Sequence, residues 1–171
     1  ELGQIESYTI QDDTLLFVNQ QSSGGSYPCY VTIGATNHVL TANYGDGTVE
    51  LLKINLSGEL SEPLYVQQHK GNGNTPRQEG PHAHSVWIED DNKSIVSVDL
   101  GTNELWFSQT IADSTLEYTE PTKLNVAPDS GPRHLTMHST GRWAYVLNEL
   151  SSTVTCIENK EGNYVKGKSI S

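Results

Sequence analysis

The sequence predicts an all-β fold built from repeated antiparallel units. Val, Ile, Thr, Tyr and Trp fill short segments in which apolar and polar residues alternate, as they do in half-buried strands. Gly, Asn, Asp and Ser separate these segments at short intervals, which is typical of tight turns. No segment shows the period of an amphipathic helix, so strands joined by turns are the expected architecture.

Three related segments repeat along the chain. They begin with "PCYVTI" at Pro28, "PHAHSVWI" at Pro81 and "PRHLTM" at Pro132. Each runs through a short alternating stretch, turns on polar residues and continues into a second apolar stretch that ends in Asn or Asp. The period of about fifty residues is close to that of β-propeller blades and longer than that of most helical repeats.

The alternating runs predict about fourteen strands. They are expected at residues 5–10, 15–20, 28–33, 39–44, 49–54, 64–69, 84–89, 94–99, 104–109, 123–127, 134–138, 144–149, 154–158 and 166–171. Because four strands form one propeller blade, this number corresponds to about three and a half blades. The sequence therefore predicts a partial β-propeller of four-stranded antiparallel blades.

The predicted domain organisation is a single partial propeller over residues 1–171. A blade remnant is expected at 1–22, and blades at about 28–70, 81–127 and 131–171. A half circle of blades leaves open edges and apolar flanks, which closed propellers avoid. Two explanations stay open: the chain is a fragment of a longer propeller, which we prefer because it starts and ends in mid-repeat, or two such pieces associate.

Charge restricts the partners. The chain has 10 Lys and Arg against 21 Asp and Glu, a net charge of −11, which repels phosphate backbones and anionic membranes. No apolar run approaches the roughly 20 residues that cross a bilayer. We therefore expect neither nucleic-acid nor membrane binding. An anionic substrate would depend on the few arginines, which are Arg77, Arg133 and Arg142.

The two cysteines, Cys29 and Cys156, lie far apart in strand-like runs and have no metal-type spacing. Small buried hydrophobic residues are the preferred interpretation over a disulfide, because free cysteine is among the most buried residue types. A reducing compartment, and so the cytoplasm, is the expected location.

Several blocks together resemble a known family. The blocks occur in the same order and at matching spacing over nearly the whole chain: "QSSGG" at 21–25, "ANYGDGTVE" at 42–50, "RQEGPHAHSV" at 77–86, "VDLGTNEL" at 98–105, "APDSGPRHL" at 127–135 and "YVLNELSSTVT" at 145–155. They resemble the lactonase family of seven-bladed β-propellers, which contains propeller-type 6-phosphogluconolactonases and 3-carboxy-cis,cis-muconate cyclases. The resemblance implies about half of a seven-bladed propeller.

The resemblance also implies functional residues. The family's functional residues lie around the PHAH, GPRH and NEL blocks, and a further arginine used by the cyclases would fall beyond residue 171. The RQE block is more similar to the phosphogluconolactonase-like members. Here the matching residues are His82, His84, Arg133, His134 and Glu149, with Arg77 in the RQE block.

Strand geometry predicts the same site from the residues themselves. In an antiparallel blade the start of the first strand and the end of the second meet at one edge. Arg133 and His134 open a first strand and Glu149 closes the second, so we expect them on one rim, together with His82 and His84 from the preceding repeat. Asn43 and Tyr44 close the corresponding strand one repeat earlier, so polar residues from three blades are expected to converge there.

Each side chain has an expected role. Arg133 would stabilise an oxyanion on a lactone carbonyl, Glu149 would act as base, and His84 would act as acid. His82, His134 and Arg77 would bind or orient the substrate, which we expect to be a small anionic lactone.

Plainer interpretations stay open for these residues. The two histidines of the PHAH block could bind a metal or only hold loops, and Glu149 could simply pair with Arg133. Asn43 and Asp99 are expected to cap turns rather than to contact a ligand. The tryptophans, at 87, 106 and 143, are expected between blades, and His38, His69 and His138 carry no functional signal.

The resemblance implies an enzyme without metal or organic cofactor. The preferred function is hydrolysis of a sugar lactone, 6-phosphogluconolactone to 6-phosphogluconate, a step of the pentose phosphate pathway. The alternatives are a cycloisomerase that closes a lactone from a carboxylated muconate, and a non-catalytic propeller that serves as a scaffold for protein partners.

Overall fold

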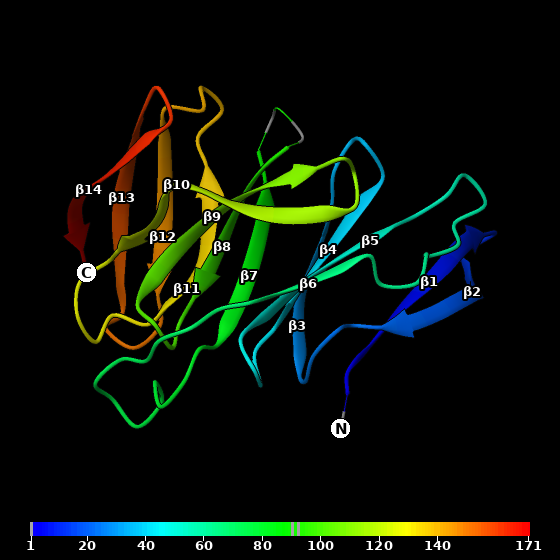
Figure 1. Ribbon diagram of the computed structural model, residues 1–171, viewed down its shortest axis with the longest axis horizontal. Helices are drawn as coiled ribbons and strands as arrows, with labels where there is room; N and C mark the ends of the chain where they lie inside the picture. Colours follow the sequence, from blue (N-terminus) through cyan, green and yellow to red (C-terminus); the bar gives the residue numbers. More distant parts are fainter. Residues whose placement is uncertain (1, 90, 92) are drawn as a thin grey trace.

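The computed structural model describes residues 2–89, 91 and 93–171, and its regular elements are all strands (Figure 1). The strands are β1 (Gln4–Gln11), β2 (Thr14–Ser22), β3 (Pro28–Ile33), β4 (His38–Asn43), β5 (Thr48–Lys53), β6 (Tyr65–Gln68), β7 (Ala83–Ile88), β8 (Ser94–Asp99), β9 (Glu104–Ile111), β10 (Thr115–Asn125), β11 (Pro132–Met137), β12 (Trp143–Asn148), β13 (Thr153–Lys160) and β14 (Asn163–Ile170). Within these described residues no helix is long and apolar enough to cross a membrane. The predicted all-β class is therefore confirmed.

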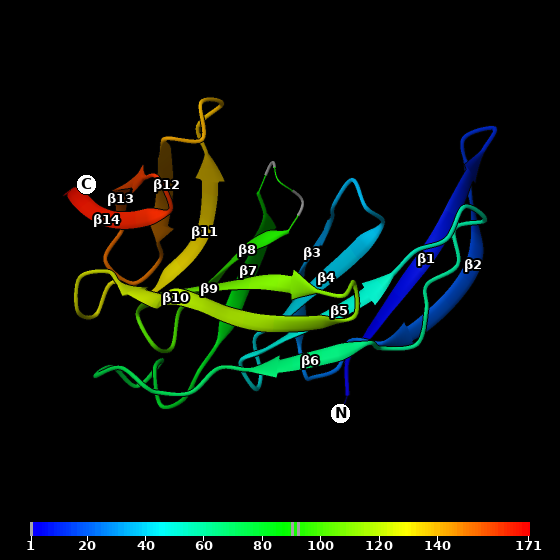
Figure 2. The same cartoon turned by 45° about the horizontal axis from the view of Figure 1, so that its top comes forward.

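The strands form one two-stranded and three four-stranded antiparallel sheets. β1 pairs with β2, and the other sheets contain β3–β6, β7–β10 and β11–β14, each in chain order from one edge to the other. The sheets stand in a row, with β1 and β2 at one end and β11–β14 at the other (Figures 1 and 2). β7 contacts both β3 and β11, so the first strands of the three complete sheets are neighbours. This row is the arrangement of successive propeller blades.

Every predicted strand range overlaps an observed strand, but β10 and β14 begin earlier than predicted. In β10 the pairing with β9 skips from Tyr118 to Lys123. The skipped segment contains Pro121, which has no N–H group to donate to a neighbouring strand. The pairing is interrupted there and resumes at Lys123, which is where the sequence pattern placed the start of this strand.

Short turns with positive φ join the strands of three hairpins. Two-residue turns connect β1 to β2, through Asp12 and Asp13 (44° and 62°), and β13 to β14, through Glu161 and Gly162 (55° and 88°), and positive φ at both residues matches the right-handed twist of such a hairpin. The β9–β10 connection is one residue longer, because Ile111 pairs with Thr115, and it begins with Ala112 and Asp113 at 47° and 58°. β1 and β2 therefore resemble the third and fourth strands of two complete sheets, whereas β5 and β6 are joined by a longer segment.

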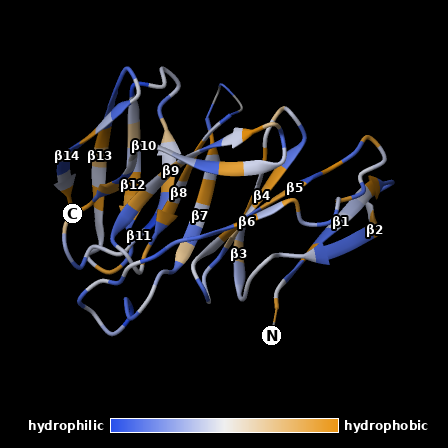
Figure 3. Ribbon diagram, in the orientation of Figure 1, coloured by the Kyte–Doolittle hydropathy of each residue, from blue (hydrophilic) through white to orange (hydrophobic). Residues whose placement is uncertain are grey.

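Apolar side chains fill the space between neighbouring sheets. One buried cluster joins the β3–β6 sheet to the β7–β10 sheet, and a second joins the β7–β10 sheet to the β11–β14 sheet. A smaller cluster lies between the β3–β6 sheet and Ile5 of β1. Figure 3 shows hydrophobic and hydrophilic residues mixed along the strands that carry these clusters. Burial of this apolar surface, at roughly 25 cal/mol per Å², is the main force that holds the sheets in a row.

Two of the three tryptophans lie between sheets as predicted. Trp87 packs against the second cluster, and the buried ring of Trp106 stacks on His69 at a centroid distance of 4.4 Å. Trp143 does not follow the prediction. It is half-buried at the start of β12, and Cζ of Arg142 lies 5.0 Å from its ring centroid. It is the first residue of β12 and belongs to none of the three buried clusters of the described residues.

Both ends of the row present apolar side chains to solvent. Leu15 and Phe17 are exposed on β2, and Tyr145 and Leu147 are exposed on β12. On β12 these residues alternate with buried ones, so one face of the strand packs on the preceding sheet and the other is open. Apolar flanks were expected for a half circle of blades, and they are present.

Candidate functional site

A β-bulge occurs at the same place in each complete sheet. The pairing of β3 with β4, of β7 with β8 and of β11 with β12 shifts by one residue near the start of the first strand. The residue inserted at each shift is, in order, Cys29, His84 and Arg133. A bulge interrupts the alternation of a strand and re-aims the inserted side chain. The fold therefore gives three successive blades an equivalent position from which a side chain can reach its neighbours.

The pairing register corrects the alignment of the repeats. Ala83, rather than Pro81, occupies the position that Pro132 holds in the next sheet. His82 consequently precedes β7, and His84 is the bulged residue. The two histidines therefore differ in their position relative to β7, although only one residue separates them.

The second strand of each complete sheet ends in a fully buried Asn or Asp. These residues are Asn43, Asp99 and Asn148. Nδ2 of Asn43 donates to Oγ1 of Thr48 at 3.1 Å, and Oδ1 of Asp99 accepts the N–H of Thr102 at 2.9 Å. The prediction that Asn43 and Asp99 hold turns is therefore confirmed. The residue after each of them leaves the sheet at the bulged end.

Arg133, His84 and Glu149 form the centre of a polar group at this end, which we call the rim cluster. It comprises Tyr44, Arg77, His82, His84, Arg133, His134 and Glu149. Nε of Arg133 lies 3.1 Å from Nε2 of His84 and 2.9 Å from Oε2 of Glu149. Arg133 and Glu149 belong to the β11–β14 sheet and its turn, whereas His84 belongs to the preceding sheet. The expected Arg133–Glu149 pair is present within one blade, and the contact of Arg133 with His84 connects it to the neighbouring blade.

Arg77 joins the same cluster from the loop of residues 69–82. Its Nη2 donates to Oε1 of Glu149 at 3.1 Å, so the two oxygens of this carboxylate face two different guanidinium groups. Its Nε and Nη2 also lie 3.3 and 3.0 Å from the hydroxyl of Tyr44. The structure therefore brings Arg77 to Glu149 although 72 residues separate them in the sequence.

Tyr44 organises the histidines of the rim cluster. Its ring stacks on that of His82 at a centroid distance of 4.4 Å and meets the edge of His84 at 5.5 Å. Its backbone oxygen lies 2.7 Å from Nδ1 of His82. His134 lies against His84 at 5.4 Å. All six residues predicted for the site are thus in one place, together with Tyr44, which the strand ends had also placed at this rim.

The whole chain, residues 1–171, matches the family model described as "Lactonase, 7-bladed beta-propeller". The chain belongs to this family. It is 36% identical over 159 residues to the 6-phosphogluconolactonase of Bacillus subtilis, an alignment that covers 91% of this chain and 45% of the relative.

Solved structures show the same relation to this lactonase-family chain. The periplasmic gluconolactonase PpgL of Pseudomonas aeruginosa superimposes with a TM-score of 0.91 and 26% identity, over 98% of this chain and 49% of that one. A protein from Lactobacillus plantarum superimposes with a TM-score of 0.90 and 28% identity, over 99% and 49%. The lactonase-family chain thus spans about half the length of the relatives that it matches.

Burial and charge keep the imidazole of His84 neutral. Burial lowers the pKa of His84, and the positive charge of Arg133 lowers it further. Burial also lowers the pKa of His134, again with a contribution from Arg133. Because Arg133 is permanently protonated, its Nε–H donates to Nε2 of His84, which must therefore carry a lone pair. Nε2 of His84 therefore has no proton to donate, whereas the sequence had led us to expect His84 as the acid.

Cys29 does not behave as the buried hydrophobic residue predicted for it. The bulge turns it out of the sheet, and the residue is exposed, while Cys156 is half-buried and both are free. Sγ of Cys29 nevertheless lies 3.3 Å from the backbone oxygen of His84, and burial of the thiol raises the pKa of Cys29 to about 11. A thiol in this state is a poor nucleophile at neutral pH.

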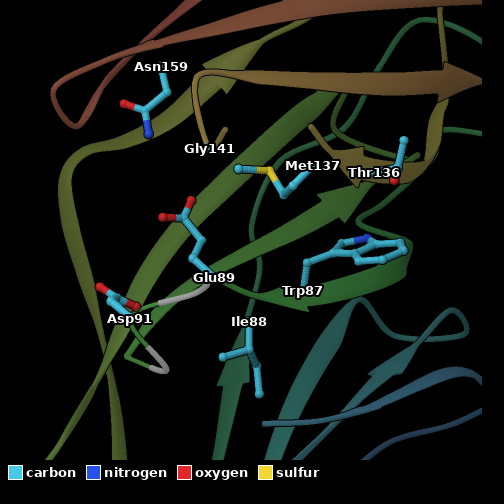
Figure 4. Close-up of a pocket in the computed structure, with 8 residues that line it drawn as sticks. All are labelled: Trp87, Ile88, Glu89, Asp91, Thr136, Met137, Gly141 and Asn159. Carbon is cyan, nitrogen blue, oxygen red and sulfur yellow. The ribbon is translucent and has the colours of Figure 1, made fainter. Parts of the chain in front are cut away.

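The rim cluster is open to solvent on the side away from the sheets. The side chains of Arg77, Arg133 and Glu149 are 53%, 38% and 32% exposed. A cavity of about 390 Å³ lies elsewhere, at the other end of the seam between β7 and β11, lined in part by Trp87 and Met137 (Figure 4). None of the predicted site residues lines this cavity. In this lactonase-family chain the cluster is therefore a solvent-accessible polar surface, separate from the cavity.

A buried network behind the rim cluster was missed from the sequence. Nδ1 of His69 lies 2.8 Å from Oδ2 of Asp99, and its Nε2 lies 3.2 Å from Oγ of Ser97, with His69 and Asp99 both 0% exposed. The other oxygen of Asp99 accepts the backbone N–H of His82 at 2.9 Å. His69 follows β6 and so reaches Asp99 from the preceding sheet. No local pattern marks it, because its partners lie about thirty residues away.

No group of three His, Cys, Asp or Glu residues in the described part of the chain is arranged to hold a metal ion. The histidine nitrogens of the rim cluster face other groups instead. Nδ1 of His82 contacts the oxygen of Tyr44, and Nε2 of His84 contacts Arg133. A permanently charged guanidinium beside Nε2 opposes a cation at the same atom. These contacts suit anion binding better than metal binding.

Proposed function

We propose that the protein containing this chain hydrolyses a sugar lactone, 6-phosphogluconolactone, to 6-phosphogluconate. The observation that carries the proposal is the Arg133–Glu149–His84 group, in which a guanidinium and a carboxylate from one blade meet an imidazole from the preceding blade. Membership of the lactonase family and the names of the Bacillus and Pseudomonas relatives support the same chemistry.

Arg133 is the proposed oxyanion-stabilising group. Its Nε is engaged by His84 and Glu149, whereas Nη1 and Nη2 have no hydrogen bond to the described residues. These nitrogens can donate to the carbonyl oxygen of a lactone. Negative charge grows on that oxygen when water attacks the carbonyl carbon, so a fixed guanidinium stabilises the transition state more than the ground state.

Glu149 is the proposed general base. Each of its oxygens contacts a guanidinium, which fixes the carboxylate between Arg77 and Arg133. In the reaction, a water molecule passes one proton to Glu149 as its oxygen bonds to the lactone carbonyl carbon. When the bond from that carbon to the ring oxygen breaks, the same proton returns to the ring oxygen, which becomes the hydroxyl of the product. The step needs no other reactant.

The structure changes the role that we propose for His84. A neutral imidazole that accepts a hydrogen bond from Arg133 has no proton on Nε2 to give to the ring oxygen. We assign it instead to holding the guanidinium of Arg133 in place. His82 and His134 flank His84 through Tyr44 and by direct ring contact, and they keep the proposed orienting and substrate-contacting roles.

We also propose the reaction type, the partners and the location of the protein. A muconate cycloisomerase would use a similar cationic pocket, but the RQE block and the names of the relatives favour hydrolysis. The exposed apolar faces of β2 and β12 suit contact with further blades or with a second copy of the chain. The net charge of −11 favours neither nucleic acid nor anionic membranes as partners, and the two free cysteines suit the cytoplasm.

The test is lactone hydrolysis by the protein as it is naturally encoded, measured above the spontaneous rate. We expect Glu149→Gln to lower kcat by about 10²- to 10⁴-fold, because the amide cannot accept the proton of water. The matched control is Glu158→Gln, which removes a carboxylate paired with Arg142 at the other end of the same sheet. Equal rates in the parent and in Glu149→Gln would rule out Glu149 as the base. No turnover by the parent would rule out the lactonase function and favour a scaffold.

A further inference from the structure

The loop that carries Arg77 is anchored in the interior of the protein. The next residue, Gln78, is fully buried, and its Nε2 donates to the backbone oxygen of Leu100 at 2.7 Å. Its Oε1 accepts the hydroxyl of Thr75 at 3.1 Å, and its backbone pairs with those of Thr75 and Gly73. The backbone position of Arg77 is thus fixed from the adjacent residue, although the side chain itself is exposed.

The guanidinium of Arg77 is held by two groups of different blades. Nε and Nη2 donate to the hydroxyl of Tyr44, which follows β4, and Nη2 donates to Glu149, which follows β12. Tyr44 and Glu149 occupy equivalent positions, each directly after the buried Asn that ends a second strand. Arg77 therefore spans the blade that lies between them, across the mouth of the rim cluster.

The arrangement leaves positive charge and donors available. Two guanidinium groups face one carboxylate, and His84 is neutral, so this part of the cluster carries an excess positive charge in a chain of net charge −11. Within the described residues, Nη1 of Arg77 has no hydrogen-bond partner. Glu79 is the nearest carboxylate of the same loop, but it is exposed and faces Nε2 of His82 at 3.5 Å, so water screens its charge.

We propose that Arg77 binds the phosphate group of the substrate and that Tyr44 is a positioning residue that holds Arg77 for this contact. The proposal rests on the proposed lactonase function. A sugar phosphate carries nearly two negative charges at neutral pH, and a guanidinium is well suited to bind it. The phosphate of the phosphorylated δ-lactone is on a carbon outside the ring. That carbon is bonded to the ring carbon on one side of the ring oxygen, and the reacting carbonyl is on the other side. The phosphate therefore lies to one side of the carbonyl. Arg133 would serve the carbonyl, and Arg77 the phosphate.

The test compares 6-phosphoglucono-δ-lactone with glucono-δ-lactone in the naturally encoded protein. Arg77→Gln should lower kcat/KM for the phosphorylated lactone by about ten- to a hundredfold, mainly through KM, because a charged hydrogen-bonding partner is lost. Tyr44→Phe keeps the ring stacking and removes only the hydroxyl, so its loss should be about three- to tenfold. In both variants the loss on the phosphorylated lactone should exceed the loss on glucono-δ-lactone.

Arg142→Gln is the matched control, since Arg142 is an exposed arginine paired with Glu158 outside the cluster, and it should change neither rate by more than about twofold. Equal losses on the two lactones in Arg77→Gln would overturn the proposal, because Arg77 would then act on the shared reaction. An unchanged Arg77→Gln would also overturn it.

Calorimetric measurement of product binding tests the phosphate site independently of lactone hydrolysis. We expect 6-phosphogluconate to bind the parent at least about tenfold more tightly than gluconate does, and Arg77→Gln to remove most of this difference. If the parent hydrolyses neither lactone but shows this difference, the lactonase function fails and the phosphate site stands. If gluconate binds as tightly as 6-phosphogluconate, the phosphate site fails whatever the turnover.

Discussion

Two arginine–glutamate pairs lie at opposite ends of the β11–β14 sheet. Arg133 and Glu149 meet at 2.9 Å at the bulged end, and Arg142 and Glu158 meet at the same distance at the other end. The second pair lies within one sheet, and within the described residues the only further ion pair of its glutamate is with Lys160, at 3.4 Å. The first pair extends to His84 in the preceding sheet and, through Arg77, to the end of β4.

The two ion pairs differ in the further groups that they contact, and not in the distance between their charged atoms. A surface ion pair gives little stability, because water screens it and two long side chains must be ordered. When the same pair is shared with an imidazole and a second guanidinium, each group limits the positions of the others, and the geometry becomes fixed. Such preorganisation is what a reaction site needs. The contrast between the two ends predicts unequal effects of equivalent substitutions.

The largest contrast is expected between Arg133→Met and Arg142→Met. Loss of an oxyanion-stabilising donor costs about 10²- to 10³-fold in kcat, so Arg133→Met should fall by this amount in lactone hydrolysis. Arg142→Met removes the same charge at the other end and should stay within about twofold of the parent. If both variants lost activity equally, general charge rather than position would explain the effect, and the comparison would fail.

The next contrast concerns two aspartates that cap turns. Asp99 is fully buried and contacts His69, His82 and Thr102, so Asp99→Asn replaces an acceptor of His69 by a donor and should lower the free energy of unfolding by about 2–3 kcal/mol.

Asp91, at the other end, accepts the N–H groups of residues 93 and 94 in an exposed turn. Asparagine forms such turns as well, so Asp91→Asn should cost no more than about 0.5 kcal/mol. Urea denaturation of the two variants measures the difference, and a smaller cost at Asp99 than at Asp91 would contradict the network.

A smaller effect is expected from pH. The pKa of His84 is lowered below its ordinary value of about 6.5, so the neutral ring is the major form at pH 6.5 and the protonated form increases at lower pH. Protonation removes the acceptor for Arg133, and kcat should then fall by up to about tenfold. The same lowered pKa makes folding less favourable as pH falls from about 6.5 through the folded value, and it has no effect above that range.

His138, in the exposed turn at the other end, supplies the control for this pH profile. His84→Asn should remove the acid limb of kcat, whereas His138→Asn should leave it in place. If the acid limb of kcat remained in His84→Asn, a group other than His84 would be responsible for it.

The smallest effect should come from removing the surface pair altogether. Arg142→Met combined with Glu158→Gln should shift Tm by no more than about 2 °C, since exposed pairs contribute little. A larger decrease, seen by calorimetry at low and at high salt, would mean that the far end is also a connected network.

Much of the fold was predictable because alternation and turn residues are local signals. The strands of the inner hairpins were placed within a residue or two, since apolar residues of period two must face the neighbouring sheets. The bulges were not predictable. Cys29, His84 and Arg133 have no chemical feature in common, and a bulge is defined only by which residue pairs with which across the sheet.

The site was predictable to the extent that strand ends determine it. The rule that a first strand begins where a second ends placed Arg133 and Glu149 together and added His84 and Tyr44 from the preceding blades. It could not indicate His69 as a contributor, because its partner Asp99 lies in another blade and the contact depends on how the sheets pack. It also did not give the protonation of His84, which follows from burial and from Arg133.

The turn that ends each second strand separates two kinds of residue that are adjacent in sequence. The first is a buried Asn or Asp, at 43, 99 and 148, and it bonds to the turn in every blade. The second, at 44, 100 and 149, is Tyr, Leu or Glu, so it varies in chemistry while its backbone is supported in the same way. At 44 and 149 a substitution can therefore alter what the rim cluster recognises without loosening the blade, whereas Leu100 is fully buried. A repeated unit of this kind can place adjustable side chains on separate blades, and selection can change a substrate preference one blade at a time.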